Sequence, residues 1–328
     1  MTSFRTIKGL PIKTISGDRT AAAPSSFESQ LYYDSDGVGI FKFIGALAAG
    51  TWASGGALNT GNNAQGGAGT QTAGLVFGGV VSDGSGTARA LSESYNGSSW
   101  SEGNDLNTAR SDPAGFGTQT AAFAVDGSAG PPNQYSVLVE SYNGTSWSET
   151  TENATGRYAS GGVGTTTAGL IWSGAISGSN TVNVEQWNGS AWSELNNLNA
   201  GRNGIGGGGV STLALACGGQ PGPGALVEAF DGTSWSETTE MNTGRIAGGY
   251  SSTSQSNVLA FGGEPTTANT EIWNGSSWTE LNNLATGRNA LVGVGNSTTL
   301  ALAVGGGSNT SPTEEFTQAH AIKTIDLS

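Results

Sequence analysis

Short apolar runs recur along the chain at intervals of about 45 residues, and each ends in Gly-Gly or a close variant. The first run spans Thr72–Gly79, and the others lie at 121–127, 168–174, 213–219, 258–263 and 300–306. They alternate little between apolar and polar positions, which indicates strands buried on both faces. A Gly-rich segment precedes each run and predicts a neighbouring strand.

After each run comes a third predicted strand, in which a Glu and an aromatic residue stand two positions apart and therefore share one face. These glutamates are Glu93, Glu140, Glu185, Glu228, Glu271 and Glu314. In every unit but the last, an Asn-Gly or Asp-Gly pair follows and predicts a tight hairpin turn into a fourth strand that carries a Trp. The Trp series is Trp52, Trp100, Trp147, Trp192, Trp235 and Trp278.

Units of four antiparallel strands, repeated six times, are the signature of a β-propeller. The unit resembles the kelch repeat over about residues 50–318, because it consists of an apolar strand ending in Gly-Gly, then Glu-x-aromatic, a turn and Trp. The last unit lacks its fourth strand, whereas Trp52 belongs to a fourth strand without a unit before it. We therefore expect an all-β, six-bladed, kelch-like β-propeller whose ring is closed by an N-terminal strand, since an open ring would leave two sheet edges exposed.

The segments outside the repeat complete the predicted organisation. Residues 1–28 are polar without a clear period and indicate an extended N-terminal arm, and residues 29–50 form a β-hairpin connector that turns at Asp36-Gly37. The propeller is expected over 51–318 and a C-terminal strand or tail over 319–328. The sequence at 321–326 echoes that at 11–16, so both could pair as strands near the same place.

Composition narrows the functional classes. The chain has 55 Gly and only 11% charged residues, which is unfavourable for helices. A net charge of −13 argues against a nucleic-acid surface, because phosphate binding needs clustered Lys and Arg. No signal peptide and no apolar run long enough to span a membrane is evident, so we expect synthesis in the cytoplasm and no membrane insertion. Cys217 is the single cysteine and cannot form an intrachain disulfide.

One repeat position carries arginine in five units, and it has two interpretations. The series is Arg110, Arg157, Arg202, Arg245 and Arg288, with Asn62 in the sixth place. A ring of guanidinium groups near one mouth of the central channel could bind an anion. Alternatively, each Arg pairs with a repeat Glu and ties the blades together, since a carboxylate beside a buried aromatic needs a partner. The matching counts favour the structural interpretation.

Candidate chemistry is sparse elsewhere. His320 is the single histidine, which argues against a copper site and against Ser-His-Asp catalysis. Equivalent acidic residues of different blades diverge, so we expect no metal site, no cofactor and no enzymatic activity. Binding residues are sought in the loops between the second and third strands, which vary most. The two longest of these loops supply the candidates Asp83, Arg89, Gln134 and Tyr135.

Two stretches resemble virion proteins of bacteriophages, particularly marine phages. The N-terminal FRTIKGLPIKTIS and SQLYYDSDGVGIFKFIG are similar to the entry segments of tail-fibre and tail-appendage domains, and YNGSSWSE and GAGTQTAGLVFGG are similar to tail propellers. The resemblance implies a structural virion component that contacts other virion proteins through residues 1–28, contacts copies of itself, and presents loops to a host-surface glycan or receptor. The alternatives are a cellular kelch-type interaction or adhesion module and a carbohydrate-active enzyme on a propeller.

Overall fold

The computed structural model describes residues 41–81, 86–130, 135–307 and 312–325, together with the short strands at 6–7, 10–11, 13–15 and 31–34; side chains are described from 48 to 319 within these ranges. The described residues form strands and turns without any helix. They divide into two compact units, one of residues 51–317 and one of residues 1–50 with 318–328.

Residues 51–317 form six four-stranded antiparallel sheets, which confirms the predicted six-bladed β-propeller. Blade 1 is β8 (Gly66–Thr70), β9 (Ala73–Phe77), β11 (Ser92–Tyr95) and β12 (Trp100–Glu102). Blade 2 is β13 (Ala114–Thr118), β14 (Ala121–Val125), β15 (Val139–Tyr142) and β16 (Trp147–Glu149). Blade 3 is β17 (Gly161–Thr165), β18 (Ala168–Trp172), β21 (Val184–Trp187) and β22 (Trp192–Glu194).

The remaining blades repeat this order. Blade 4 is β23 (Asn203–Val210), β24 (Leu213–Gln220), β25 (Val227–Phe230) and β26 (Trp235–Glu237). Blade 5 is β27 (Gly249–Ser254), β28 (Asn257–Phe261), β29 (Thr270–Trp273) and β30 (Trp278–Glu280). Blade 6 is β31 (Val292–Val294), β32 (Leu300–Val304), β33 (Thr313–Thr317) and β6 (Thr51–Ser54). Two short antiparallel strand pairs lie in the connections between these strands. They are β7 (Asn62–Asn63) with β10 (Val80–Val81), and β19 (Ala175–Ile176) with β20 (Ser179–Asn180).

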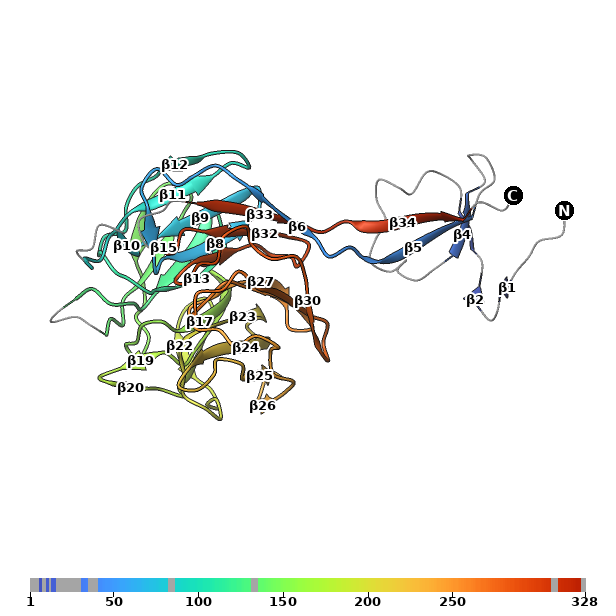
Figure 1. Ribbon diagram of the computed structural model, residues 1–328. Helices are drawn as coiled ribbons and strands as arrows, with labels where there is room; N and C mark the ends of the chain where they lie inside the picture. The colour runs from blue at the N-terminus through green and yellow to red at the C-terminus, as the bar shows by residue number, and fades with distance from the viewer. Residues whose placement is uncertain are drawn as a thin grey trace. The chain divides into compact units, whose positions relative to one another are not determined.

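Blade 6 closes the ring as the sequence predicts, because its fourth strand comes from the N-terminal end of the propeller. Figure 1 shows β6 beside β33, and the register places Trp52 opposite Phe316. The Trp52 ring packs against Phe316 and Phe261, with ring centroids 5.0 and 4.9 Å away. The junction to blade 1 is tied by Tyr95, whose hydroxyl donates to Glu315. Burial and that carboxylate raise the pKa of Tyr95 to about 12, so the hydroxyl stays protonated.

The aromatic residues of each blade stack within its outer hairpin. The partners are Tyr95 and Trp100, Tyr142 and Trp147, Trp187 and Trp192, Phe230 and Trp235, Trp273 and Trp278, and Phe316 and Trp52. The Asn-Gly turns between these strands are stabilised by the Asn side chain. Asn96 Oδ1, for example, accepts hydrogen bonds from the backbone N–H groups of Ser98 and Ser99, both 3.0 Å away. The Trp series therefore belongs to the blade packing.

The innermost strands of neighbouring blades approach so closely that glycine is needed between them. A Cβ placed on Gly115 of blade 2 would lie 2.5 Å from the backbone N and 2.7 Å from the backbone O of Gly67 in blade 1. Those atoms belong to a strand that is fixed on its other edge, so they cannot move aside cheaply. The Gly-rich segments thus set the spacing of the ring.

We expect Gly115→Ala to lower the free energy of unfolding by about 1–3 kcal/mol, because overpacking forces two inner strands apart. Urea denaturation followed by tryptophan fluorescence measures the effect. Gly103→Ala is the matched control, since a Cβ there lies 3.6 Å from its nearest neighbour, the Ser92 backbone O, and should change stability little. Equal stability of both variants would contradict this explanation of the glycines.

The second unit contains a four-stranded sheet in the order β3 (Lys13–Ile15), β4 (Leu31–Asp34), β5 (Phe41–Leu47) and β34 (His320–Ile325). β4 and β5 pair antiparallel, as expected for the hairpin. β3 pairs parallel with β4, and β34 pairs antiparallel with β5. Residues 13–15 and 321–325, which belong to the two similar segments, therefore lie at opposite edges of one sheet. A separate pair joins β1 (Thr6–Ile7) to β2 (Leu10–Pro11).

Candidate functional site

The propeller has two faces that differ in content. One, here called the loop face, carries the connections between the second and third strands of each blade, such as 262–269, and the crossovers between blades, such as 281–291. The other, here called the turn face, carries the hairpin turns, such as Asn143-Gly144. The chain enters the propeller at Thr51 and leaves it at Thr317, which are paired with each other at the turn face. The described parts of the second-to-third-strand loops, which vary most between blades, therefore lie opposite the point of entry and exit.

The five repeat arginines are buried, and each bonds to a glutamate in the blade that it introduces. Four of the pairs have N–O distances of 2.5 Å (Arg110 and Glu140), 3.0 Å (Arg202 and Glu228), 2.5 Å (Arg245 and Glu271) and 2.9 Å (Arg288 and Glu314), and Arg157 pairs with Glu185. Nη2 makes the ion pair with the glutamate, and Nη1 donates to backbone carbonyls. Arg202 Nη1, for example, donates to Gly218 O at 2.6 Å and to Leu226 O at 2.8 Å. The five arginine side chains are each 3% exposed or less, so their guanidinium groups are turned into the blades.

Each repeat glutamate also holds the crossover that leads into its blade. Glu140 accepts hydrogen bonds from the backbone N–H groups of Asn107 and Thr108, at 2.7 and 3.2 Å. In blade 1, Glu93 accepts equivalent bonds from Asn59 and Thr60, at 2.9 and 3.1 Å. There Asn62 stands in place of the arginine and donates to Gly78 O at 2.6 Å. The same crossover geometry is therefore maintained in blade 1 with a shorter side chain.

Asp126 is a buried carboxylate at a position where the other blades have Gly or Ser. It accepts a hydrogen bond from Asn153 at 2.7 Å, and its Oδ2 lies 3.5 Å from Arg157 Nε. Burial raises the pKa of Asp126 well above its usual range, and Arg157 opposes this only in part. A carboxyl with a raised folded-state pKa gives its full contribution to stability below the unfolded pKa, about 3.9, and loses it as the pH rises through the folded pKa.

We therefore expect Asp126→Asn to be more stable than the unchanged protein at pH 7 and equally stable near pH 4. Asn tolerates the left-handed backbone at this position, where φ is 61°. Urea denaturation between pH 4 and 8 measures the difference. The control is Asp231→Asn, which gives the exposed turn of blade 4 the Asn-Gly sequence of the other blades and should leave the slope near neutral pH unchanged. Lower stability of Asp126→Asn at every pH would show that Arg157 needs the charge.

A ring of six left-handed residues surrounds the channel mouth on the loop face. Its members are Ala64, Asp112, Ala159, Gly204, Ala247 and Ala290, with φ between 50° and 62°. Five hydrogen bonds of 2.7–3.0 Å join neighbouring members, each from the backbone N–H of one member to the backbone carbonyl of the member before it in the ring. They run from Asp112 to Ala64, Ala159 to Asp112, Gly204 to Ala159, Ala247 to Gly204, and Ala64 to Ala290. Asp112 alone among the six has a charged side chain, and burial raises its pKa to about 6.

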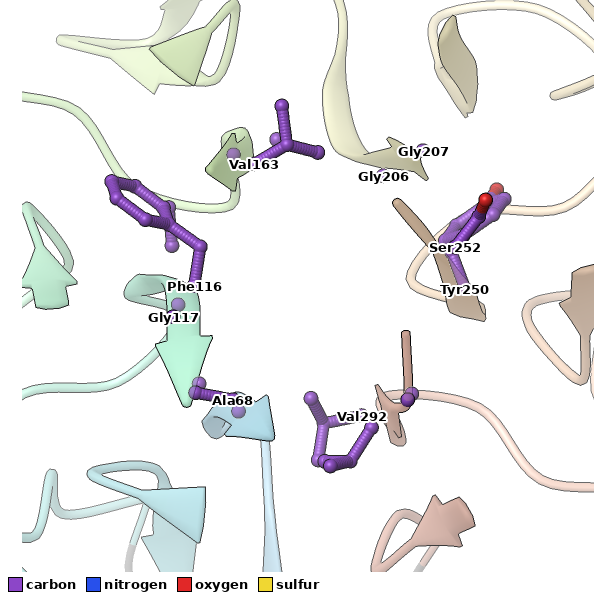
Figure 2. Close-up of a pocket in the computed structure, with 18 of the residues that line it drawn as sticks. Ala68, Phe116, Gly117, Val163, Gly206, Gly207, Tyr250, Ser252 and Val292 are labelled. Carbon is purple, nitrogen blue, oxygen red and sulfur yellow. The ribbon is translucent and has the colours of Figure 1, made fainter. Parts of the chain in front are cut away.

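The central channel begins directly beyond this ring and has a volume of about 210 Å³. Figure 2 shows Ala68, Phe116, Val163, Gly206, Tyr250 and Val292 around an open space, one from each blade. Glycine backbone and small side chains make up most of the wall. Among the described residues no group of three or more His, Cys, Asp or Glu side chains could hold a metal ion, here or elsewhere.

Of the four loop candidates, Asp83 and Gln134 lie outside the described residues. Arg89 is half-buried, and its backbone N–H donates to Gly79 O at 2.8 Å. Tyr135 is 37% exposed and stacks on Tyr158, with ring centroids 6.1 Å apart and the ring planes 28° apart. Tyr135 comes from the second-to-third-strand loop of blade 2, and Tyr158 from the crossover into blade 3.

Sequence reasoning missed Tyr158 and a neighbouring group of amide side chains. Tyr158 occupies the repeat position that holds Asn63, Ser111, Asn203, Ile246 and Asn289 in the other units, so comparison of the units would have marked it. Asn203 Nδ2 donates to Asn180 Oδ1 at 2.6 Å, and Gln220 Nε2 donates to Asn203 Oδ1 at 3.0 Å. No comparable signal identifies Asn180 and Gln220, because their contact depends on the fold.

Comparison with known proteins adds no further assignment, because no family model and no curated protein matches the chain. Within the part of the chain that the structure describes, there is no helix that could cross a membrane. The propeller fold itself is compatible with a structural or interaction module.

Proposed function

We propose that the protein is a non-enzymatic structural component of a phage virion, of the tail-appendage type. Residues 1–28 attach it to other virion proteins, and the propeller presents its loop face to a glycan or receptor on the host surface. The observation that carries the proposal is the division of the propeller into two faces. Chain entry and exit lie together on the turn face, and the described parts of the loops that vary most between blades lie on the other.

The contacts within the propeller support a scaffolding role. The repeat Arg and Glu side chains are engaged in buried pairs, and the repeat aromatics are engaged in blade packing. Loops on such a rigid framework can vary in sequence without loss of the fold, which is the arrangement of many binding proteins. The resemblance of the N-terminal and repeat sequences to phage tail proteins gives the virion context.

Mass spectrometry of particles purified by density gradient, from the sample that carries the gene, tests the proposal. Peptides of this chain should band with the major virion proteins and remain with them after nuclease and high-salt washes. Recovery of the chain only in fractions free of particles would overturn the virion assignment.

A further inference from the structure

Two tyrosines form an exposed aromatic surface where blades 2 and 3 meet on the loop face. Tyr135 and Tyr158 stack on each other, and Tyr135 exposes 37% of its surface. In the described part of the chain the other large exposed hydrophobic residues are Val210, Leu213 and Leu300, which lie at hairpin ends on the turn face. Tyr135 thus keeps more than a third of its surface accessible to a ligand while Tyr158 supports its ring.

The backbone holds this tyrosine pair in place. Ser136 N donates to Gly127 O at 3.1 Å, which fixes the end of the Tyr135 loop. Tyr158 and Ala175 exchange two backbone hydrogen bonds, of 3.2 and 2.9 Å. A ligand that stacks on the pair would therefore meet two residues whose flanking backbone is already hydrogen-bonded, which favours affinity.

A chain of amide side chains lies beside the tyrosines. Asn180 Nδ2 donates to Gln220 O at 2.8 Å, and the bonds from Asn203 and Gln220 described above complete the chain. A primary amide has two N–H groups, and these bonds use one from Asn203 and one from Gln220. Each of these two amides thus has a second N–H group to donate; Gln220 is exposed and Asn203 is half-buried.

The aromatic and amide parts are adjacent across blade 3. Tyr158 pairs with Ala175, and Ala175 pairs with Asn180 in the β19–β20 hairpin. Two strand spacings separate the Cα atoms of Tyr158 and Asn180 by about 10 Å. A ligand of a few rings can therefore contact both parts at once.

We propose that Tyr135, Tyr158, Asn180, Asn203 and Gln220 form a binding site for a neutral oligosaccharide. The C–H face of a pyranose ring packs on an aromatic ring, and its hydroxyl groups exchange hydrogen bonds with amides held in fixed orientations. All five side chains are uncharged, and the net charge of −13 disfavours a polyanionic glycan. The site rests on the proposed function, for which it supplies the ligand class.

The test uses the full chain on an array of oligosaccharides, followed by calorimetry with the best ligand. The neutral probes are maltoheptaose, cellohexaose, mannohexaose, galactan oligomers and chitohexaose, and the anionic probes are heparin and polysialic acid. We expect binding to at least one neutral series and none to the anionic probes. Tyr158→Ser, which installs the residue that blade 2 has at this position, and Tyr135→Ala should each weaken binding at least about tenfold.

Asn203→Ala should also weaken binding, and blade 5 accommodates the apolar Ile246 at the same repeat position. Leu213→Ala removes an exposed apolar side chain from the turn face and is the matched control, with unchanged affinity expected. Tryptophan fluorescence checks that each variant is folded. Failure to bind any neutral probe, binding only to anionic probes, or equal affinity of the tyrosine variants and the control would overturn the site. None of these results would affect recovery of the chain in virions.

Discussion

Replacement of Glu228 by alanine is expected to lower the free energy of unfolding by about 3–5 kcal/mol, because it leaves Arg202 buried without its carboxylate. Glu228 is fully buried and accepts hydrogen bonds from Arg202 Nη2 at 3.0 Å and from the Asn199 backbone N–H at 2.8 Å. The substitution therefore removes the partner of a buried charge and the anchor of the crossover between blades 3 and 4. Urea denaturation followed by tryptophan fluorescence measures the loss.

The structure supplies a matched control on the neighbouring strand. Glu237 lies directly opposite Glu228 in the β25–β26 pair, but its side chain is exposed. Glu237→Ala should change stability by no more than about 0.5 kcal/mol, as expected for a surface position. If both alanine variants lost the same stability, the buried Arg–Glu pairs would not be what holds the crossovers.

Phe316→Ala is expected to lower the free energy of unfolding by about 3–5 kcal/mol and also to release β6 from blade 6. Phe316 is fully buried and packs against Trp52, the main side chain by which β6 contacts the ring. β6 pairs only with β33, so after loss of this contact the closing strand is held by that pairing and by the contacts of Trp52 with Phe261 and Thr270. Hydrogen exchange of the amides at 51–54 should accelerate well beyond that of the other outer strands.

Phe230→Ala separates the closure effect from general destabilisation. Phe230 is equally buried and stacks on Trp235 in blade 4, where all four strands are contiguous in sequence. It should cost a similar amount of stability but leave exchange at 51–54 close to that of the unchanged protein. Equal acceleration in both variants would mean that β6 opens only when the whole ring unfolds.

The sequence predicts the fold well because one pattern recurs in six units. Trp52 illustrates this, since its lack of a preceding unit and the missing fourth strand after Phe316 together indicate which blade is shared. The Asn-Gly turns, the paired aromatics and the buried apolar runs each follow from local chemistry. The number of blades then follows from the number of units.

Contacts between residues that the repeat does not place together could not be predicted in this way. Ala64 and Ala290 look ordinary in the sequence, yet they bond to each other because the ring brings the first and last units together. The variable loop of blade 2 points to Tyr135, but its partner Tyr158 belongs to the next crossover. Both cases depend on how neighbouring blades meet, which no single unit encodes.

The paired entry and exit of the chain has a mechanical consequence. Tension on residues 1–50 and 318–328 reaches the propeller through Thr51 and Thr317, which face each other at one end of the same strand pair. When β6 and β33 are pulled at the same time and in the same direction, neither strand slides past the other. The force then passes to the contact between β33 and β32. Five residue pairs join those two strands in register, from Leu300 and Thr317 to Val304 and Thr313. A pull applied to Thr51 and Thr317 together would therefore leave the β6–β33 junction, at which the chain is discontinuous, unloaded.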